Sequence, residues 1–464
     1  MKPVRTILLC LLPASGASLA IACSGSDPRG TFEPEDAGTD ARSDTNVHDE
    51  DGALGDAPSN KPPFDPADEP VSCAAAPCAV DLVAGNSHFC ARMNDNTVRC
   101  WGDDTKGSLG RGAPGNADAG ADGGWLVPRV ADLQQAVQLS AGGTTTCGVV
   151  SDGGVYCWGG NDRGQLGLDV SAPAYDADRH PTPSMVALPG AAKRVDVGPT
   201  SACAVLANGE VWCWGENAHG QLARATSTTA GVPAKAEMGE LRIASTAMGS
   251  YTGLGLTEAG DVVSWGAVRD PEGSLAGRVS SLVIDPRPFA IGLGSVAGLA
   301  AGATKLHPPG PPRWAWLGIG HACAVVKGEL FCWGDSLKGA LGMGHQELVV
   351  EPRRAELEST TAWAQQVAIG GDLTCVRLTD GTVECAGDNS FGALGSDATV
   401  PYATYFRRVV SFEQHAVKIS AATQTVCALV RDGSVLCWGS NGWGELGQGT
   451  VDNDAHASPV RVRL

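Results

Sequence analysis

The stretch CALVRDGSVLCWGSNGWGELG, residues 427–447, contains the unit from which most of this 464-residue chain is built. Two cysteines ten residues apart enclose an Asp-Gly pair, and Trp-Gly and a glycine-punctuated tail follow. Similar phrases are CGVVSDGGVYCWGGNDRGQLG at 147–167 and CAVLANGEVWCWGENAHGQLA at 203–223. Short runs of Val, Leu and Thr broken by Gly, Asn and Asp are typical of β-strands joined by hairpins.

Seven such units can be aligned on the Trp-Gly pair, and no sustained 3.6-residue period occurs in them. Their spacing of 51 to 68 residues is the scale of a propeller blade, and seven units suit a closed ring. We therefore expect an all-β fold, a seven-bladed β-propeller. The units are marked by Trp101, Trp158, Trp214, Trp265, Trp333, Ala386 and Trp438.

The cysteine spacing matches a hairpin. Between Cys427 and Cys437, a three-residue loop centred on Asp432 ends in Gly433, which can adopt the positive φ that such loops need. The two cysteines then lie directly opposite each other on adjacent antiparallel strands. Their separation is near disulfide range.

One unit departs from this spacing in an informative way. Cys323 and Cys332 are nine residues apart, and their turn, Lys327-Gly328, is shorter by one residue as well. Spacing and turn length change together, as paired cysteines require. In the fourth unit both cysteines are replaced together, by Leu254 and Ser264.

Disulfide staples are the interpretation that we favour, with buried free thiols and metal or redox sites as alternatives. A metal would need further ligands beside each pair, and only His88 and His321 lie near cysteines. Redox catalysis usually needs exposed, closely spaced thiols. The expected pairs are Cys73–Cys78, Cys90–Cys100, Cys147–Cys157, Cys203–Cys213, Cys323–Cys332, Cys375–Cys385 and Cys427–Cys437.

The first 22 residues read as an export signal, with basic Lys2 and Arg5, a short apolar run and small residues. The sequence Ala20-Ile21-Ala22-Cys23 resembles a bacterial lipobox, in which cleavage precedes the cysteine and Cys23 is lipidated. We expect a lipoprotein of the bacterial cell envelope, in the outer membrane, and not a cytoplasmic protein. The alternative is ordinary cleavage nearby, with an incidental Cys23 and a secreted product.

Residues 23–70 are poor in large apolar side chains and rich in Asp and Glu, so we expect a disordered acidic linker there. The propeller would then occupy 71–464. The net charge of −18 argues against nucleic acid, because phosphate binding needs clustered Lys and Arg.

From about residue 80 to 464 the units resemble the regulator-of-chromosome-condensation repeat, although the fourth is degraded and Ala386 breaks the sixth Trp-Gly. The resemblance implies four-stranded antiparallel blades. We also expect residues 459–464 to pair into the blade formed by residues 80–101, which would close the ring.

Fold alone does not decide function. The eukaryotic archetype of the family is a guanine-nucleotide exchange factor of a small nuclear GTPase that contacts chromatin, and bacterial relatives include a β-lactamase inhibitor. For an exported chain we expect a non-catalytic, monomeric scaffold that binds an unknown protein or ligand at the envelope, with no cofactor and no metal. An extracytoplasmic propeller hydrolase or lyase is the alternative, and exchange activity is the least favoured.

Two insertions and two aromatic positions are the candidates for an interface. We expect residues 111–124 to be a flexible loop. Residues 268–314 are a candidate for contact with a partner, because long loops in compact domains are often functional. The longer insertion ends in prolines beside Trp314 and Trp316. Phe391 and Trp443 share one loop position before Gly-x-Leu, where an aromatic residue can anchor an interface; the alternative is that both pack within their loops.

Overall fold

Strands make up nearly all regular structure in the part of the chain that the computed structural model describes. Described are residues 61–65, 67, 69–112, 127, 129–130, 132–168, 174–268, 276–294, 296–302, 320–396 and 399–464. Among them, Leu337–Gly339 forms a short 3-10 segment. None of the described segments is a helix with the length and hydropathy to span a bilayer.

Each sheet is antiparallel and is formed by strands consecutive in the chain, so one sheet is one blade. The first blade contains β1 Ala79–Ala84, β2 His88–Met93 and β3 Val98–Gly102; the second β4 Ala136–Gly142, β5 Thr145–Val150, β6 Val155–Gly159 and β7 His180–Met185; and the third β8 Ala192–Val197, β9 Ser201–Leu206, β10 Val211–Asn217 and β11 Ser227–Lys235. The fourth blade contains β12 Ile243–Met248, β13 Thr252–Thr257, β14 Val262–Ala267 and β15 Ile284–Ala290, and the fifth β16 Val296–Gly302, β17 His321–Val326, β18 Glu329–Gly334 and β19 Val349–Ala355. The sixth blade contains β20 Ala364–Ile369, β21 Leu373–Leu378, β22 Val383–Asp388 and β23 Tyr402–Arg408, and the seventh β24 Ala416–Ala421, β25 Thr425–Val430, β26 Val435–Asn441 and β27 Asp452–Arg461. Six blades have four strands. The first has three among the described residues, with Arg129 bridged to Arg99 at the place of a fourth.

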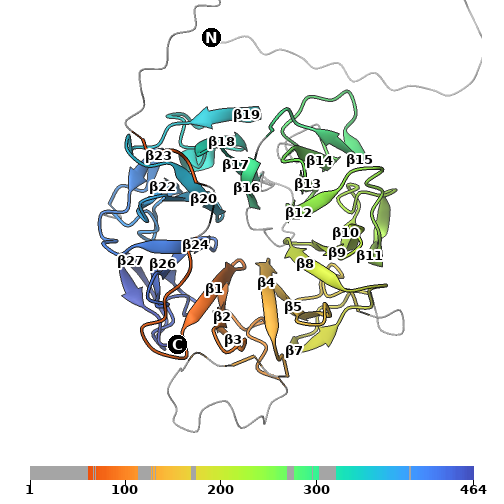
Figure 1. The fold of residues 1–464 in the computed structure, drawn as a ribbon, viewed down its shortest axis with the longest axis horizontal. Coiled ribbons are helices and arrows are strands. Elements are labelled where there is room, and N and C mark those ends of the chain that lie inside the picture. Colours follow the sequence, from red (N-terminus) through yellow and green to blue (C-terminus); the bar gives the residue numbers. More distant parts are fainter. Residues whose placement is uncertain are drawn as a thin grey trace, which may run out of the picture. The chain divides into compact units, whose positions relative to one another are not determined.

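The seven blades form a ring, shown in Figure 1. The first strand of every blade is innermost, and each contacts the first strand of the next blade, from β1 round to β24 and back to β1. The expected seven-bladed β-propeller is confirmed.

The hairpins have the register that the cysteine spacing predicts. Cys427 is the register partner of Cys437, and Gly433 in the turn has φ +82°. In the fifth blade Cys323 faces Cys332 across Lys327 and Gly328, which have φ values of +51° and +85°. Two positive φ values identify the two-residue turn that fits the twist of a hairpin.

A tryptophan hydrogen bond joins successive blades. In five blades the indole Nε1 of the Trp-Gly pair donates to a backbone carbonyl in the loop of the preceding blade. The donors and acceptors are Trp101 and Glu445, Trp158 and Ser108, Trp214 and Gln165, Trp265 and Gln221, and Trp438 and Ala393, at 2.8 to 2.9 Å. A buried indole N–H needs such a partner, so the repeated Trp specifies how blades pack.

In the sixth blade, where Ala386 replaces this Trp, Phe406 of β23 occupies the space instead. Phe406 is buried in one cluster with Ala386, and its ring lies against Gly342 of the preceding blade. In other blades the equivalent glycine lies against the Trp, as Gly167 lies against Trp214. The aromatic packing is thus kept and the indole hydrogen bond is lost.

The predicted ring closure by residues 459–464 is wrong. β27 pairs with β26 inside the seventh blade, with Arg461 opposite Leu436, and it is not part of the first blade's sheet, which contains β1, β2 and β3. The ring closes through packing and side chains instead: Val462 is buried in a cluster with Trp101, and Ser420 Oγ donates to the Leu82 carbonyl.

Residues 61–78, here called the strap, precede the first blade and contact blades five to seven. Trp363 Nε1 donates to the Pro62 carbonyl, and Lys61 Nζ lies 4.5 Å from the Trp363 ring centroid. Glu69 forms ion pairs with Arg431 and with His415, the latter at 3.0 Å. The expected linker boundary at 70/71 therefore falls inside a segment that lies against the propeller.

Candidate interaction face

The ring has two different ends. One end, the loop face, carries the connection between the first and second strands of each blade and the connection between the third and fourth. The other end, the hairpin face, carries the Asp-Gly turns and the connections between blades. Loops at one end of a rigid scaffold are where binding residues usually gather.

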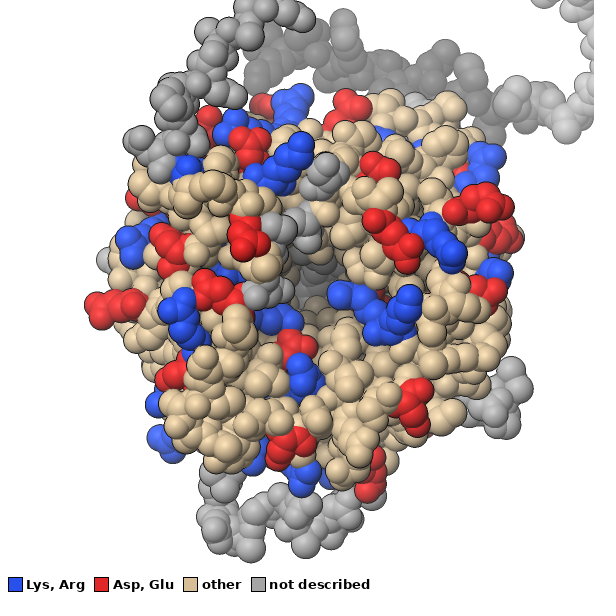
Figure 2. Space-filling view, in the orientation of Figure 1, with Lys and Arg blue, Asp and Glu red and all other residues tan. Residues whose placement is uncertain are grey.

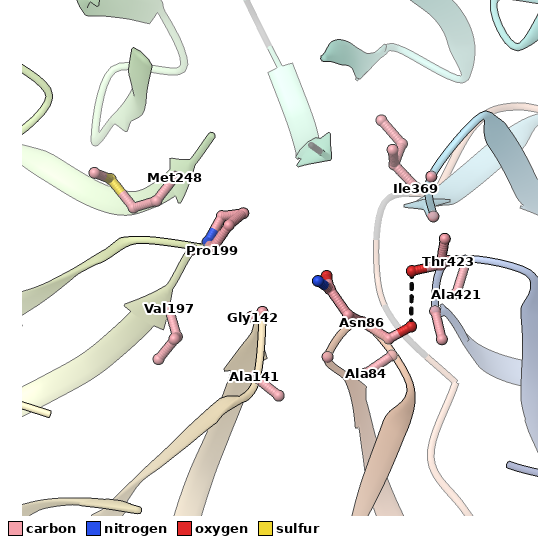
Figure 3. Close-up of a pocket in the computed structure, with 16 residues that line it drawn as sticks. Ala84, Asn86, Ala141, Gly142, Val197, Pro199, Met248, Ile369, Ala421 and Thr423 are labelled. Atoms are coloured by element: carbon pink, nitrogen blue, oxygen red, sulfur yellow. Dashed lines mark hydrogen bonds between the residues drawn. The ribbon is translucent and has the colours of Figure 1, made fainter. Parts of the chain in front are cut away.

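On the loop face, the mouth of the central channel is lined mainly by Gly and Ala (Figure 3). Asn86, Pro199 and Thr423 come from the ends of the innermost strands, and Thr423 Oγ1 donates to the Asn86 carbonyl at 2.8 Å. The recess has a volume of about 80 Å³. This volume is far below that of typical small-molecule sites, about 300 to 1,000 Å³.

Further along, the channel is lined by charged side chains that pair with each other. Lys418 pairs with Asp81 across the first and seventh blades, and Arg194 Nε lies 2.6 Å from Asp196 Oδ1. Figure 2 shows the hollow at the ring centre, with acidic and basic side chains interspersed over the visible end. The first pair joins two blades, the second lies within β8, and in both the opposite charges are paired.

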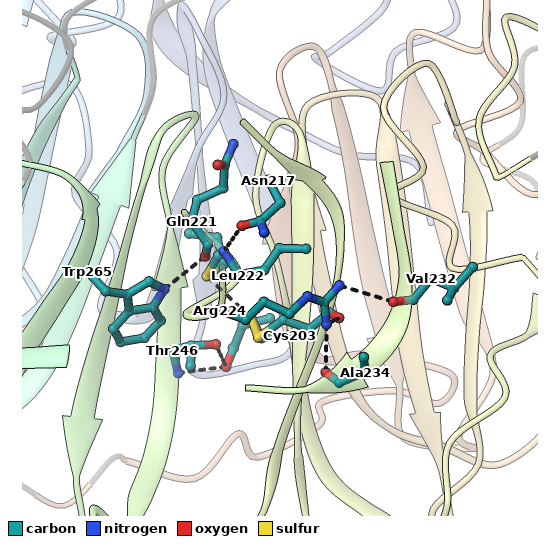
Figure 4. The surroundings of a disulfide bond; sticks show 12 residues. Cys203, Asn217, Gln221, Leu222, Arg224, Val232, Ala234, Thr246 and Trp265 are labelled. Atoms are coloured by element: carbon teal, nitrogen blue, oxygen red, sulfur yellow. Dashed lines mark hydrogen bonds between the residues drawn. A yellow bond between two sulfur atoms is a disulfide. The ribbon is translucent and has the colours of Figure 1, made fainter. Parts of the chain in front are cut away.

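The seven cysteine pairs are disulfides in the structure. The twelve hairpin cysteines are fully buried, and each of these pairs has a Cα separation of 4.1 Å. In Figure 4, Cys203 lies in the blade interior beside Arg224, which donates to the carbonyls of Val232 and Ala234. Burial of this kind suits a staple and does not suit a redox centre.

The two histidines that precede cysteines also join blades. His88 Nε2 lies 2.7 Å from Thr146 Oγ1, and His321 Nε2 lies 2.7 Å from Thr374 Oγ1, each in the following blade. Burial lowers the pKa of both imidazoles to about 4. Among the described residues no three His, Cys, Asp or Glu side chains gather as a possible metal site.

The third-to-fourth strand loops share one anchor, a carboxylate or amide Oδ1 that accepts the backbone N–H of the Gly-x-Leu leucine. The anchors are Asp104, Asn161, Asn217, Asn389 and Asn441, at 3.0 to 3.3 Å. The sequence carries this signal as a polar residue three positions after Trp, but the repeat alignment did not assign it a role. The anchored loops present the residue before Gly-x-Leu on the loop face.

That residue reaches the next blade in most copies. Lys106 Nζ lies 2.9 Å from Asp162 Oδ1. Arg163 Nη1 lies 3.8 Å from Glu216 Oε1, and Lys338 Nζ lies 2.8 Å from Asp388 Oδ2. In the third blade, the ring centroids of His219 and Tyr251 are 4.4 Å apart. The position therefore normally serves contact between blades.

Phe391 and Trp443 occupy this position in blades six and seven. Phe391 is half-buried, and its carbonyl accepts the His456 N–H of the next blade at 3.0 Å. Trp443 has a 48% exposed side chain. The structure thus distinguishes the two predicted interface residues, with Phe391 joined to its neighbour and Trp443 presented to solvent.

Three carboxylates lie together on the loop face between blades five and six. Asp335 is only 8% exposed, and its Oδ2 has no hydrogen-bond partner in the described part of the chain. Burial raises the pKa of Asp335 to about 6, and the neighbouring Asp372 carboxylate contributes to the rise. Burial alone would raise the pKa of Asp388, but hydrogen bonds from Lys338 and Ser390 lower it below the ordinary value. Sequence reasoning missed this cluster because its members come from two blades.

The segment 268–314 is not one long loop. It contains β15, the outer strand of the fourth blade, and β16, the innermost strand of the fifth. The prediction treated two strands as insertion because the degraded fourth unit hides their blade pattern. Trp314 and Trp316 lie outside the described residues, as do Cys23 and most of 111–124.

Comparisons with known proteins support this fold. Two models of the Regulator of chromosome condensation (RCC1) repeat match the chain, one at 79–108, 136–165 and 192–221, the other at 152–205, 208–256 and 327–377. The molecule is thus a disulfide-stapled seven-bladed β-propeller. The two models place RCC1 repeats in the first four blades and across the fifth and sixth, in agreement with the sequence resemblance.

The curated relatives come from several kinds of protein. Ultraviolet-B receptor UVR8 of Arabidopsis thaliana is 29% identical over 378 residues, which cover 80% of each chain. Regulator of chromosome condensation of Drosophila melanogaster is 25% identical over 350 residues, covering 72% of this chain and 59% of that protein. E3 ubiquitin-protein ligase HERC2 of Homo sapiens is 27% identical, but the match spans 6% of its length.

Solved structures agree on the fold. Prp20p from Saccharomyces cerevisiae, whose structure was described with its binding properties to Gsp1p and histones, superposes with a TM-score of 0.62 at 20% identity, covering 84% of this chain and 87% of that one. Human WBSCR16 superposes with a TM-score of 0.59 at 18% identity, covering 75% and 86%.

Proposed function

We propose that this chain is an exported interaction scaffold that binds a protein partner through its loop face. The observation that carries the proposal is the exposure of Trp443 at a loop position that other blades use for contact with a neighbour. A large aromatic side chain held half in solvent on an anchored loop is a typical interface anchor.

The relatives support a binding role, since the named proteins include a receptor and a regulator, and Prp20p binds Gsp1p and histones. Beyond its mouth, the channel widens to a space of about 350 Å³, and charged side chains there, Lys418 with Asp81 and Arg194 with Asp196, already pair with each other.

Export and membrane attachment are part of the proposal. Seven disulfides fit an oxidising compartment outside the cytoplasm. We propose that Cys23 is lipidated and that the acidic segment after it acts as a spacer between membrane and propeller. Radiolabelled palmitate should label the wild-type chain and not Cys23→Ser; label on both would contradict the anchor.

Binding is tested by affinity capture from an envelope fraction, with the full chain carrying Cys23→Ser as bait. Trp443→Ala should lose the captured partner. The matched control is Val410→Ala, because Val410 is exposed and apolar but lies after β23 at the hairpin face. Equal capture by wild type and Trp443→Ala would contradict the proposed loop-face interface.

A further inference from the structure

Charges on the loop face are balanced differently in the two halves of the ring. In blades one to three, three of the acids there have cationic partners: Asp162 has Lys106, Glu216 has Arg163, and Asp104 has Arg179. Opposite charges within reach of each other neutralise the local field. That half offers little net charge to a partner.

Blades five to seven have a loop face with a clear excess of acid. Of the eleven Lys and Arg in residues 320–464, Lys338 is the one on the loop face; the others lie toward the hairpin face, inside the blades or in the channel. The described acids on this part of the loop face, here called the acidic sector, are Asp335, Glu347, Asp372, Asp388, Glu445, Asp452 and Asp454.

Within the acidic sector, the ammonium group of Lys338 pairs with Asp388 and acts electrostatically on Asp372. Lys338 Nζ bonds Asp388 Oδ2, while Asp335 has a buried oxygen without a hydrogen-bond partner in the described residues. A buried carboxylate oxygen that lacks a donor is costly, and a second cation would remove that cost. The cluster therefore favours a cationic ligand group.

Exposed apolar side chains border the acidic sector. Each of the outer strands β19, β23 and β27 begins on the loop face beside an exposed residue, respectively Leu348, Val400 and Val451. Trp443 lies on the loop that leads to β27. The combination of carboxylates with aliphatic and aromatic groups suits long basic side chains, whose stems are apolar and whose cations can stack on Trp.

We propose that the loop face of blades five to seven binds a basic segment of a partner protein, with Arg or Lys groups facing Asp335, Asp372 and Asp388 and apolar groups contacting Trp443. This inference rests on the proposed scaffold function and specifies the chemistry of the partner. Complementary charge would steer the encounter and set the orientation of the complex.

The test uses fluorescein-labelled nonaarginine and nonaglutamate with the full chain carrying Cys23→Ser, measured by fluorescence anisotropy at low salt. Nonaarginine should bind and nonaglutamate should not. Asp372→Asn with Asp454→Asn should weaken nonaarginine binding by about fivefold. The matched control is Glu356→Gln with Glu413→Gln, which removes the same charge from exposed positions at the hairpin face of the same blades and should change affinity less than twofold.

Equal weakening by both pairs of substitutions, no weakening by the first pair, or no binding of nonaarginine to wild type would each overturn the inference. Thermal melting of every variant verifies folding, and Asp454→Asn alone, at an exposed position, replaces the pair if the pair unfolds. If partner capture depends on Trp443 but nonaarginine does not bind, the proposed scaffold function is retained. Only the proposal that the partner segment is basic is then rejected.

Discussion

The indole Nε1 of Trp101 donates a hydrogen bond to the backbone carbonyl of Glu445, 344 residues away in the chain, at 2.8 Å. This is the same bond that joins neighbouring blades elsewhere, here made between the first blade and the last. The propeller therefore closes through its repeated contact between blades, without sharing a strand between its two ends.

Trp101→Phe should weaken this closure. Phenylalanine keeps an aromatic side chain but has no indole N–H, so the buried carbonyl of Glu445 is left without its donor. We expect a loss of about 1 to 3 kcal/mol in the free energy of unfolding, measured with urea. Faster hydrogen exchange should appear in β1 to β3 and β27. Trp438→Phe, which breaks a bond inside the ring, is the control; the same exchange pattern in both variants would contradict a special role of Trp101 at the seam.

The disulfides should be quantitative in the native protein. We expect no reaction with iodoacetamide before reduction and alkylation of fourteen cysteines after reduction in denaturant. Replacing Cys427 and Cys437 by Leu and Ser, as the fourth blade has them, should cost about 2 to 3 kcal/mol. Free thiols in the native exported protein by intact mass would refute the staples.

The strap should detach from the propeller without unfolding it. Glu69→Ala removes ion pairs to Arg431 and His415 that are partly exposed, so the stability loss should be below about 1 kcal/mol. Chymotrypsin should nevertheless cleave after Phe64, which lies in the strap, several times faster. Glu413→Gln leaves the strap contacts intact and should cleave at the wild-type rate; an unchanged rate in Glu69→Ala would mean that Glu69 does not hold the strap.

Acid should destabilise the fold through His88 and His321. Their pKa values are lowered to about 4 in the folded chain, against an ordinary value of about 6.5, so the unfolded chain binds more protons between these limits. Stability is then lost as pH falls from about 6.5 to 4, by up to about 3 kcal/mol per histidine.

Urea unfolding at pH 7, 5.5 and 4 measures this loss. A His88→Gln and His321→Gln variant should show a shallower decline over that interval than wild type, because glutamine can still bond to threonine but does not titrate. A decline of the same size in both proteins would assign the acid sensitivity to other groups.

Much of the fold could be predicted from the repeat itself, because hairpin register, turn length and cysteine position depend on one another over about ten residues. The nine-residue spacing of Cys323 and Cys332 matched its shorter turn, and the structure shows the two cysteines in register. Such local geometry is present in the sequence pattern.

Contacts between distant segments could not be read in this way. The closure of Trp101 on Glu445 and the replacement of the missing Trp by Phe406 depend on which surfaces meet after folding. The acidic cluster of Asp335 and Asp372 has the same origin, since its members belong to different blades. At the shared loop position, sequence comparison identified Phe391 and Trp443 alike, and only burial separated them.

The central claim is that a partner binds on the loop face of blades five to seven, and site-specific photo-crosslinking in intact cells tests it most directly. A photoreactive amino acid would replace Val451 on the loop face in one strain and Val410 at the hairpin face in another, both exposed positions. We expect a discrete protein adduct from position 451 that disappears with Trp443→Ala, and none from position 410. An adduct at position 410 with none at 451 would contradict it.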